Sequence, residues 1–487
     1  MRSSRTFSAL VALLNVRFVL TSPVATEVNR AMIDGVTFIN KGIVAFGLIP
    51  SDFKESTGDT LGGIGSAIAL KPNSWKAEGG RFSGTLFVHP DRGFNVDTTI
   101  NYQSRHHEID FKLEPYYGTR NLSFNDAQKT LRLTYKNTVL EFDVNRKTTS
   151  GLDPQSARLP DQRLRSSFPG PLPIVSSADN RLVLDVEGMI ANPDGSFWIS
   201  DEYGPGIYRY SHEGDLLQSI ALPDAILPRD AAGNLNYTSV VNPVAGRDPN
   251  QGFENLTIDR SNKRLYAMLQ SATMQDGGTD KTTSRYTRLF AFDLESLKLV
   301  GEWVVPLPLS SSGKTLASSE IILVRPGVFL ALARDANGRG GDDTESSYKH
   351  ADLFSIHGAT DIHGTKFDSH LNPVAVNGVL DSSIKPVEYV SFLDYLNPTQ
   401  LARFGLHNEI GGADDQTLIS SKWESFALAP VGDKKFPDDY FLFTACDNDF
   451  LSTHGVSLGQ PFDAGIDNDN QFLVFRVTLP GAPHDSY

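Results

Sequence analysis

The chain has 487 residues, of which 40% are hydrophobic and 21% charged, and it includes 41 glycines and 27 prolines. Its 44 basic and 58 acidic residues give a net charge of −14, which argues against nucleic acid as a partner because a phosphate backbone requires a basic footprint. The single cysteine, Cys446, excludes an intramolecular disulfide. This composition is typical of a folded, β-rich protein.

The N-terminal segment resembles a secretory signal peptide. It has basic Arg2 and Arg5, an apolar run over residues 7–14 and small residues around positions 22–25. We therefore expect residues 1–25 to be a signal peptide, residues 34–487 to form a single domain, and the protein to be secreted as a monomer. The remaining sequence contains no apolar run near the ~20 residues that span a bilayer, so we expect no membrane partner.

The clearest element is a hairpin over residues 184–205, with the sequence LDVEGMIANPDGSFWISDEYGP. Its Pro-Asp-Gly triplet at 193–195 favours a tight turn, and the flanking β-branched and aromatic residues suit strands. Glu187 lies at the start of the first strand, while Asp201 and Glu202 follow the second. Carboxylates gathered this closely need protons, a cation or a basic partner, because like charges repel one another.

Four further segments repeat this arrangement of two apolar runs separated by a turn. Three begin near Glu254, Glu320 and Glu424, and the fourth has Ser66 near the corresponding place. Charged residues again end the second run, namely Asp91 and Arg92, Arg334 and Asp335, and Asp447 and Asp449. Outer-strand candidates follow the hairpins, namely HEIDFKLEP, GIYRYSHEGDLLQSIALP, RLFAFDLESLKLVGEWVVPL, ADLFSIHG and QFLVFRVTL.

Repeated hairpins of this kind indicate a β-propeller, because one hairpin cannot bury its apolar face alone. The spacing of roughly 65 to 110 residues exceeds the ~40 to 50 of compact blades, so long inter-blade loops are expected. The sequence thus predicts an all-β fold, a β-propeller of about six irregular blades. Residues 392–406 have helix-like spacing interrupted by Pro398, which predicts one or two short helices there.

Motifs of several other enzyme classes are missing from the sequence. There is no G-x-S-x-G nucleophile elbow and no H-E-x-x-H zinc motif, and the glycine-rich residues 62–68 fail the dinucleotide-binding pattern at its last position. These observations argue against serine hydrolases of that type, zinc proteases and nucleotide-dependent enzymes.

Several stretches together resemble the phytase-like family, also called esterase-like activity of phytase, in a secreted fungal-type form. The specific part is the order DVEGM, PDGSFWISDEYGP and QGFE, supported by LYAMLQSATMQDGG, FLALARD, KWESFALAP and DNDF. The resemblance implies a β-propeller and hydrolysis of a phosphomonoester, with a small-molecule phosphate ester as the partner.

On a propeller, the repeated glutamates would converge at one end of the central channel, and a ring of oxygen ligands suits Ca²⁺. A bound cation would also allow an anionic ester to approach carboxylates. We assign catalytic roles to Glu187, Asp201, Glu202 and Glu254. We assign substrate-binding roles to Arg92 and Arg334, because arginine contacts phosphate in a bidentate manner. The metal ligands are predicted to be Glu320, Asp335, Glu424 and Asp447.

Two other functions fit the same residues. A lactonase-like hydrolase would use the acidic ring on an uncharged ester and would not need Arg92 or Arg334. A binding propeller without catalysis would use the carboxylates only to cap backbone N–H groups or to pair with arginine between blades. The sequons at Asn121, Asn236 and Asn255 are potential glycan sites, although a glycan at Asn255 would obstruct Glu254.

Overall fold

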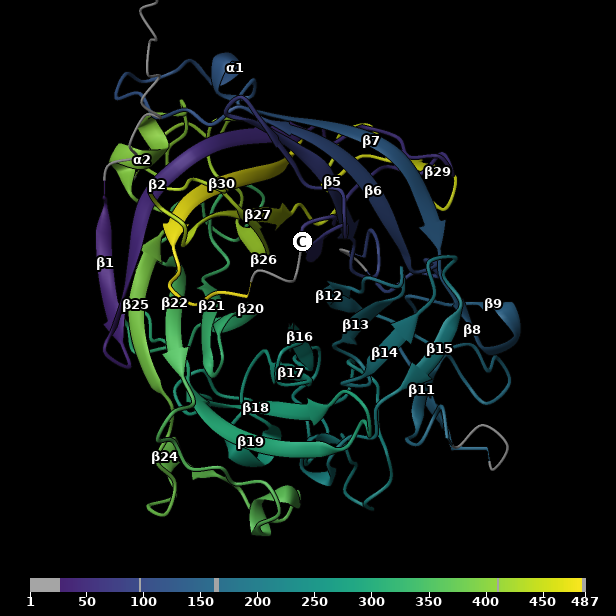
Figure 1. The fold of residues 1–487 in the computed structure, drawn as a ribbon. Coiled ribbons are helices and arrows are strands. Elements are labelled where there is room, and N and C mark those ends of the chain that lie inside the picture. The colour runs from purple at the N-terminus through teal and green to yellow at the C-terminus, as the bar shows by residue number, and fades with distance from the viewer. Residues whose placement is uncertain (1–26, 96–97, 162–165, 410, 484–487) are drawn as a thin grey trace, which may run out of the picture.

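A computed structural model describes residues 27–95, 98–161, 166–409 and 411–483. The predicted signal peptide lies outside these residues. Figure 1 shows β-sheets arranged around a common centre, which confirms the predicted all-β propeller. In the described residues there are five such blades rather than about six, one for each of the five hairpins recognised in the sequence.

Three blades are each built from consecutive antiparallel strands. The first of these contains β12 (Val186–Ala191), β13 (Phe197–Asp201), β14 (Ile207–Tyr210) and β15 (Leu216–Ser219). The second contains β16 (Phe253–Asp259), β17 (Arg264–Leu269), β18 (Tyr286–Asp293) and β19 (Leu299–Pro306). The third contains β20 (Ala317–Arg325), β21 (Val328–Arg334), β22 (Lys349–Ser355) and β25 (Glu388–Asp394). The outer strands predicted from the sequence are therefore confirmed in these blades.

A fourth blade contains β3 (Ala67–Leu70), β5 (Arg81–His89), β6 (Arg105–Leu113) and β7 (Leu131–Leu140), with β4 (Lys76–Glu78) paired to β5. The fifth blade joins the two ends of the chain. Its order is β1 (Asn29–Ile33), β2 (Val36–Ile49), β30 (Asn470–Thr478), β27 (Asp439–Asp447) and β26 (Lys422–Pro430). The purple β2 and yellow β30 lie side by side in Figure 1, so N-terminal and C-terminal strands close the ring together.

Short elements decorate the loops between these strands. Two-stranded sheets are β8 (Phe142–Asp143) with β9 (Lys147–Thr148), β10 (Ser156–Arg158) with β11 (Leu172–Ile174), β23 (Ala375–Val376) with β24 (Val379–Leu380), and β28 (Gly455–Ser457) with β29 (Gln460–Phe462). The helices are α1 (Phe124–Ala127) and α2 (Pro398–Ala402), with 3-10 turns at Val144–Arg146, Asp224–Ile226, Met274–Asp276 and Lys366–Asp368. Pro398 occupies the first turn of α2, where its missing N–H is harmless. No helix among the described residues is long and apolar enough to cross a membrane.

Apolar side chains between neighbouring blades form the core. Between the fourth and fifth blades, for example, Phe111 packs against Phe443 with ring centroids 5.0 Å apart, and Leu86 and Phe472 are fully buried in the same cluster. Burying each such side chain contributes about 1.5–3 kcal/mol. The inner strands β3, β12, β16, β20 and β26 contact one another in a closed ring and surround a narrow channel of about 100 Å³.

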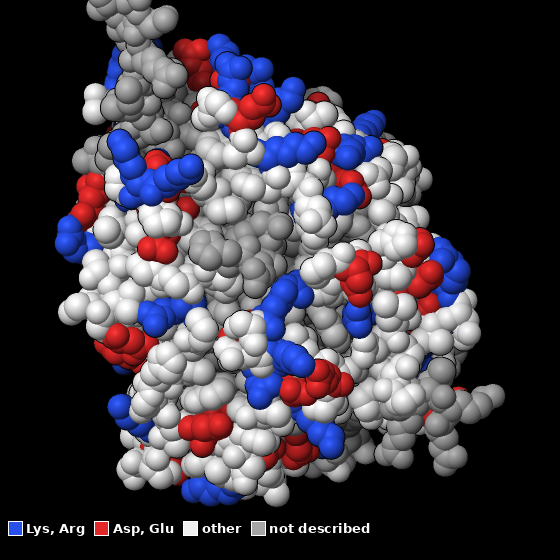
Figure 2. All heavy atoms as spheres, in the orientation of Figure 1, with Lys and Arg blue, Asp and Glu red and all other residues white. Residues whose placement is uncertain are grey.

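Charged side chains on the face seen in Figure 1 are mixed. Figure 2 shows Lys and Arg interspersed with Asp and Glu there, without a broad area of one sign. The net negative charge of the chain is therefore not concentrated on that face. The buried carboxylates lie at the mouth of the channel where the inner strands begin.

Candidate active site

Three of the four repeated glutamates occupy the same structural position. An extra residue interrupts the pairing of the inner strand with its neighbour in each blade, and that residue is Glu187 in β12, Glu254 in β16 and Glu424 in β26. A bulge of this kind re-aims the side chain that it carries. The three glutamates therefore point toward the same mouth of the channel, as the repeats predicted.

Glu320 lies one position away from this pattern. The extra residue in β20 is Ser319, between Ser318 and Glu320 in the pairing with β21. The carboxylate of Glu320 instead accepts hydrogen bonds from the backbone N–H groups of Leu256, at 3.1 Å, and Ile321, at 2.7 Å. Glu320 thus joins two inner strands in the channel wall, and the structure does not bring it into a ligand set with Asp335 as expected.

Asp201 stabilises the corner that follows β13. Its two carboxylate oxygens accept hydrogen bonds from the backbone N–H groups of Asp185, at 2.7 Å, and Gly204, at 2.8 Å. Burial raises the pKa of Asp201 to about 7, although these hydrogen bonds act in the opposite direction. The geometry gives Asp201 the role of positioning Asp185 and Tyr203.

Asp335 anchors the loop after β21. Its carboxylate accepts hydrogen bonds from Ser346 Oγ at 2.7 Å and the Ser347 backbone N–H at 2.6 Å, and Lys349 Nζ lies 3.2 Å away. Burial would raise the pKa of Asp335, but Lys349 and these donors lower it below its ordinary value. Both carboxylate oxygens of Asp335 therefore contact groups of this loop, and Asp335 does not join the other predicted metal ligands.

The other predicted carboxylates meet further acids at the channel mouth. We call this group the acidic cluster, and it comprises Asp91, Asp185, Glu187, Glu202, Glu254, Glu424, Asp447 and Asp449. Two triplets stand out, because carboxylate oxygens within each lie within 4.8 Å of one another. The first triplet is Asp185, Glu187 and Glu202, and the second is Asp91, Asp447 and Asp449.

The pKa values in the acidic cluster show a shortage of positive charge. Burial is the largest cause that raises the pKa of Glu187 well above its ordinary range, and Glu254 and Glu202 raise it further by repulsion. Burial likewise raises the pKa of Glu424 to about 8, despite two nearby basic groups. With protein groups alone, Glu424 would therefore be largely protonated at neutral pH.

Glu202 and Glu254 form a carboxyl pair. Burial raises the pKa of both, and a hydrogen bond between the two side chains raises that of Glu202 while it opposes the rise at Glu254. Gln270 donates a second hydrogen bond that also opposes the rise at Glu254. A proton shared between two carboxyls in this way can be given to a reacting group or taken from one.

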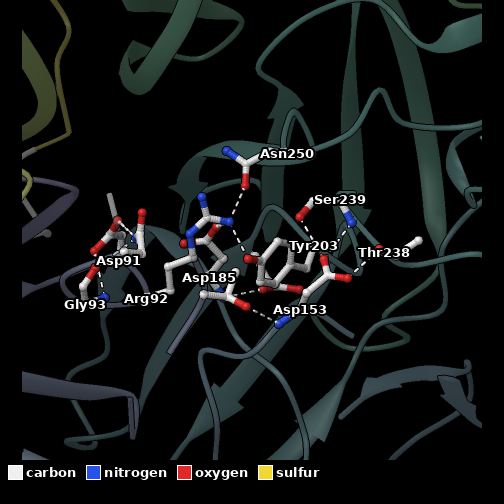
Figure 3. A network of polar contacts seen from close by, with 12 residues as sticks. Asp91, Arg92, Gly93, Asp153, Asp185, Tyr203, Thr238, Ser239 and Asn250 are labelled. Atoms are coloured by element: carbon white, nitrogen blue, oxygen red, sulfur yellow. Dashed lines mark hydrogen bonds and ion pairs between the residues drawn. The ribbon is translucent and has the colours of Figure 1, made fainter. Parts of the chain in front are cut away.

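Arg92 lies beside Asp185 of the first triplet (Figure 3). Its Nη1 donates hydrogen bonds to the Tyr203 hydroxyl and, at 2.7 Å, to Oδ1 of Asn250, and it lies 3.2 Å from Oδ2 of Asp185. The buried Nε of Arg92 has no acceptor within the part of the chain that the structure describes. One N–H group of Arg92 is therefore left without a partner among the described residues.

Arg334 and Lys422 supply the remaining positive charge. Arg334 donates from Nη2 to Oε1 of Glu424, while its buried Nε also lacks an acceptor among the described residues. Lys422 Nζ contacts Oδ2 of Asp447 and lies 2.8 Å from Oδ1 of Asp449. These acids outweigh the effect of burial and keep the pKa of Lys422 above its ordinary value.

A long loop between β15 and β16 is fastened beside the cluster. Asp153 accepts hydrogen bonds from Thr238 and, at 2.7 Å, from both the backbone N–H and the hydroxyl of Ser239 (Figure 3). The fully buried Arg247 donates to the Tyr203 carbonyl oxygen at 2.9 Å. These contacts fasten the loop that carries Asn250 next to Tyr203, and both residues accept a hydrogen bond from Nη1 of Arg92.

A polar cavity of about 490 Å³ opens next to Arg334. Gln251 and Gln270 lie on its wall near the acidic cluster, and Lys281 and Lys314 line it as well. The volume and the polar lining suit a small, charged or hydroxylated ligand. A ligand in this cavity would contact Arg334 directly.

Sequence reasoning gave no role to Asp185 and Lys422, and it noted Asp91 only as a corner residue. A signal was present, since Asp185 and Lys422 each lie two positions before a repeated glutamate, in DVE and KWE. Alternate residues of a strand share a face, so a charged residue at this spacing points to the same region. The residues that Asp185 and Lys422 contact could be found only from the structure.

Comparisons with known proteins identify a family and a similar fungal protein. Residues 60–398 match the profile of the family described as "Phytase-like: Esterase-like activity of phytase". The chain is also 37% identical over 464 residues to an "Uncharacterized secreted protein" of Arthroderma benhamiae, with 86% of this chain and 89% of that protein covered.

Two solved structures show more remote similarity. A luciferin-regenerating enzyme is 10% identical, with a TM-score of 0.28 and coverage of 90% of this chain and 97% of that one. A protein of unknown function from Dyadobacter fermentans is 10% identical, with a TM-score of 0.33 and coverage of 90% and 98%. At these scores neither similarity bears on function.

Proposed function

Because this chain belongs to the phytase-like family, we propose that it is a secreted phosphoric ester hydrolase whose acidic cluster binds Ca²⁺ and a small phosphomonoester. The observation that carries the proposal is the excess of buried carboxyls over basic side chains at one mouth of the propeller. The name of the Arthroderma relative, a secreted protein, supports the extracellular location.

The residues of the first triplet fit a hard divalent cation. Ca²⁺ prefers carboxylate and carbonyl oxygens in flexible arrangements, and Asp185, Glu187 and Glu202 offer such oxygens close together. Oδ1 of Asp185 is buried and, among the described residues, accepts no hydrogen bond. When bound there, a cation would supply positive charge for phosphate oxygens and would lower the pKa of a water molecule.

The two arginines fit the phosphoryl group of the substrate. Arg92 and Arg334 each keep a buried Nε–H without an acceptor in the described chain, and they border the cluster from different blades. Hydrogen bonds from arginine to phosphate are charge-assisted and therefore strong. Tyr203 and Asn250 hold Arg92 in place for this contact.

Glu254 fits the role of proton donor. Water adds to phosphorus, the bond from phosphorus to the ester oxygen breaks, and the leaving alcohol must gain a proton. Glu254 shares a hydrogen bond with Glu202 and burial raises the pKa of both carboxyls, so this pair can supply that proton through Glu254. The attacking water loses a proton, and this proton returns Glu254 to its protonated form. The reaction therefore conserves atoms and charge.

A lactonase-like hydrolase is the second candidate, and one observation favours it. Both arginines already have carboxylate partners, Asp185 for Arg92 and Glu424 for Arg334. A site whose basic groups are neutralised in this way suits an uncharged ester better than an anionic one. A binding propeller without catalysis is the outcome if neither substrate reacts.

Hydrolysis of a generic phosphomonoester, of phytate and of a simple lactone tests these alternatives, each with Ca²⁺ and with chelator. We expect chelator-sensitive phosphate release that is lost in Glu187→Gln, while the exposed Glu213→Gln serves as the matched control. Arg334→Ala should abolish phosphate release. Hydrolysis of the lactone alone would support the second candidate, and no hydrolysis of any substrate would overturn the enzymatic proposals.

A further inference from the structure

The two carboxylate triplets of the acidic cluster differ in one respect. Each places three oxygens within 4.8 Å of one another, which is compact enough to surround a cation. Among the described residues, only the second triplet, Asp91, Asp447 and Asp449, has an ammonium group in contact with it. This difference bears on how many cations the site can hold.

Lys422 supplies that ammonium group from the first residue of β26. Its Nζ contacts Oδ2 of Asp447, lies 2.8 Å from Oδ1 of Asp449 and lies 3.7 Å from Oε1 of Glu424. Asp449 is held for this contact by its own backbone N–H, which donates to Oδ1 of Asp447 at 2.7 Å. Nζ therefore lies against carboxylate oxygens from the end of β27 and the turn that follows.

The first triplet has no comparable partner. Within the described residues, neither Glu187 nor Glu202 forms an ion pair, and Arg92 contacts only Oδ2 of Asp185. Oδ1 of Asp185 and Oε1 of Glu202 are buried and receive no hydrogen bond from a described N–H or hydroxyl group. Buried anionic oxygens without a donor require another source of positive charge.

We propose that Lys422 takes the place of a second cation, so that the mouth of the propeller binds a single divalent cation at Asp185, Glu187 and Glu202. The inference rests on the cation of the proposed function, but it does not depend on hydrolysis. The tethered ammonium keeps a fixed positive charge between Asp447 and Asp449, whereas Glu187 and Glu202 gain such a charge only when a cation is bound.

The test is a count of bound ions on the whole secreted protein. After treatment with chelator and desalting, Ca²⁺ is titrated by calorimetry and Mn²⁺ by electron paramagnetic resonance. We expect a single ion in the natural protein, none in Glu187→Gln, and a second ion in Lys422→Gln. Lys422→Arg keeps the positive charge and should retain a single ion, as should the exposed control Lys263→Gln.

A further variant covers the case in which Lys422→Gln does not fold. Asp449→Asn removes an oxygen ligand from the second triplet only, so we expect it to keep a single ion with affinity within a few-fold of the natural protein. Two ions in the natural protein, no ion in it, or loss of binding in Asp449→Asn would each overturn the inference. A single bound ion without ester hydrolysis would refute the proposed function and leave this inference standing.

Discussion

Arg334 at the end of β21 donates a hydrogen bond to Glu424 on β26, and this ion pair joins two neighbouring blades at the mouth of the channel. The pair is largely buried, with the Arg334 side chain 11% exposed and that of Glu424 3% exposed. The contact thus serves two purposes, since it links blades and sets the charge of the candidate site.

Arg334→Ala should lower stability as well as activity. Without the guanidinium, Glu424 loses its hydrogen-bond donor, and an unsatisfied buried group costs about 1–3 kcal/mol. Protonation of Glu424, whose pKa is already raised to about 8, limits the loss at neutral pH. Denaturant unfolding measures the change, and Arg334→Lys is the control. An unchanged free energy of unfolding would show that the ion pair contributes nothing to stability.

Stability without divalent cations should fall as pH rises from about 4 to 8. Burial raises the pKa of Asp201 to about 7 and that of Glu424 to about 8, whereas the pKa of an aspartate or glutamate in the unfolded chain is about 4. The folded state then binds more protons than the unfolded state across this range, so stability is present below the unfolded pKa and lost as pH rises through the folded one.

Thermal unfolding in chelator at about pH 5 and about pH 8 measures this effect, and we expect a midpoint a few degrees lower at the higher pH. Excess Ca²⁺ should reduce the difference, because a bound cation favours the ionised carboxylates. A midpoint in chelator that is equal or higher at the higher pH would contradict the raised pKa values of Asp201 and Glu424.

A second buried ion network supports the blade of β16 to β19, away from the candidate site. Arg288 lies 2.7 Å from both Asp276 and Glu302, and all three side chains are fully buried. Arg288→Met leaves two buried carboxyls unpaired, so we expect a loss of about 3–5 kcal/mol in the free energy of unfolding. Lys263→Met, in an exposed pair, should leave the unfolding midpoint nearly unchanged. Equal effects of the two variants would argue against this interpretation.

Glycans should be absent from Asn255. Its side chain is fully buried in β16, where Nδ2 donates to the Met268 carbonyl oxygen at 3.1 Å and Oδ1 accepts from Ser318 at 2.8 Å. Asn121 is exposed and Asn236 is half-buried, so these two remain accessible for modification. Mass spectrometry of the secreted protein after enzymatic release of glycans checks each site. An occupied Asn255 would be incompatible with the packing of β16 between its neighbours.

Much of the architecture follows from local patterns. The hairpin of β12 and β13 was predicted with its turn, since Gly195 has the positive φ of 85° that a tight Pro-Asp-Gly turn requires. Alternation of apolar and polar residues also located the outer strands of the blades. The number of blades was less accessible, because long loops blur the repeat and because the last blade combines strands from both ends of the chain.

By itself, the sequence determined a β-propeller with repeated glutamates near one mouth of the channel, because hairpins and their end residues are encoded locally. Only the tertiary structure decided which acids meet. A one-residue difference in the bulge of β20 places Ser319 where Glu320 was expected, and Lys422 pairs with Asp447. Such outcomes depend on how strands from distant parts of the chain pack, since a shift of one residue turns a side chain to the other face of the sheet.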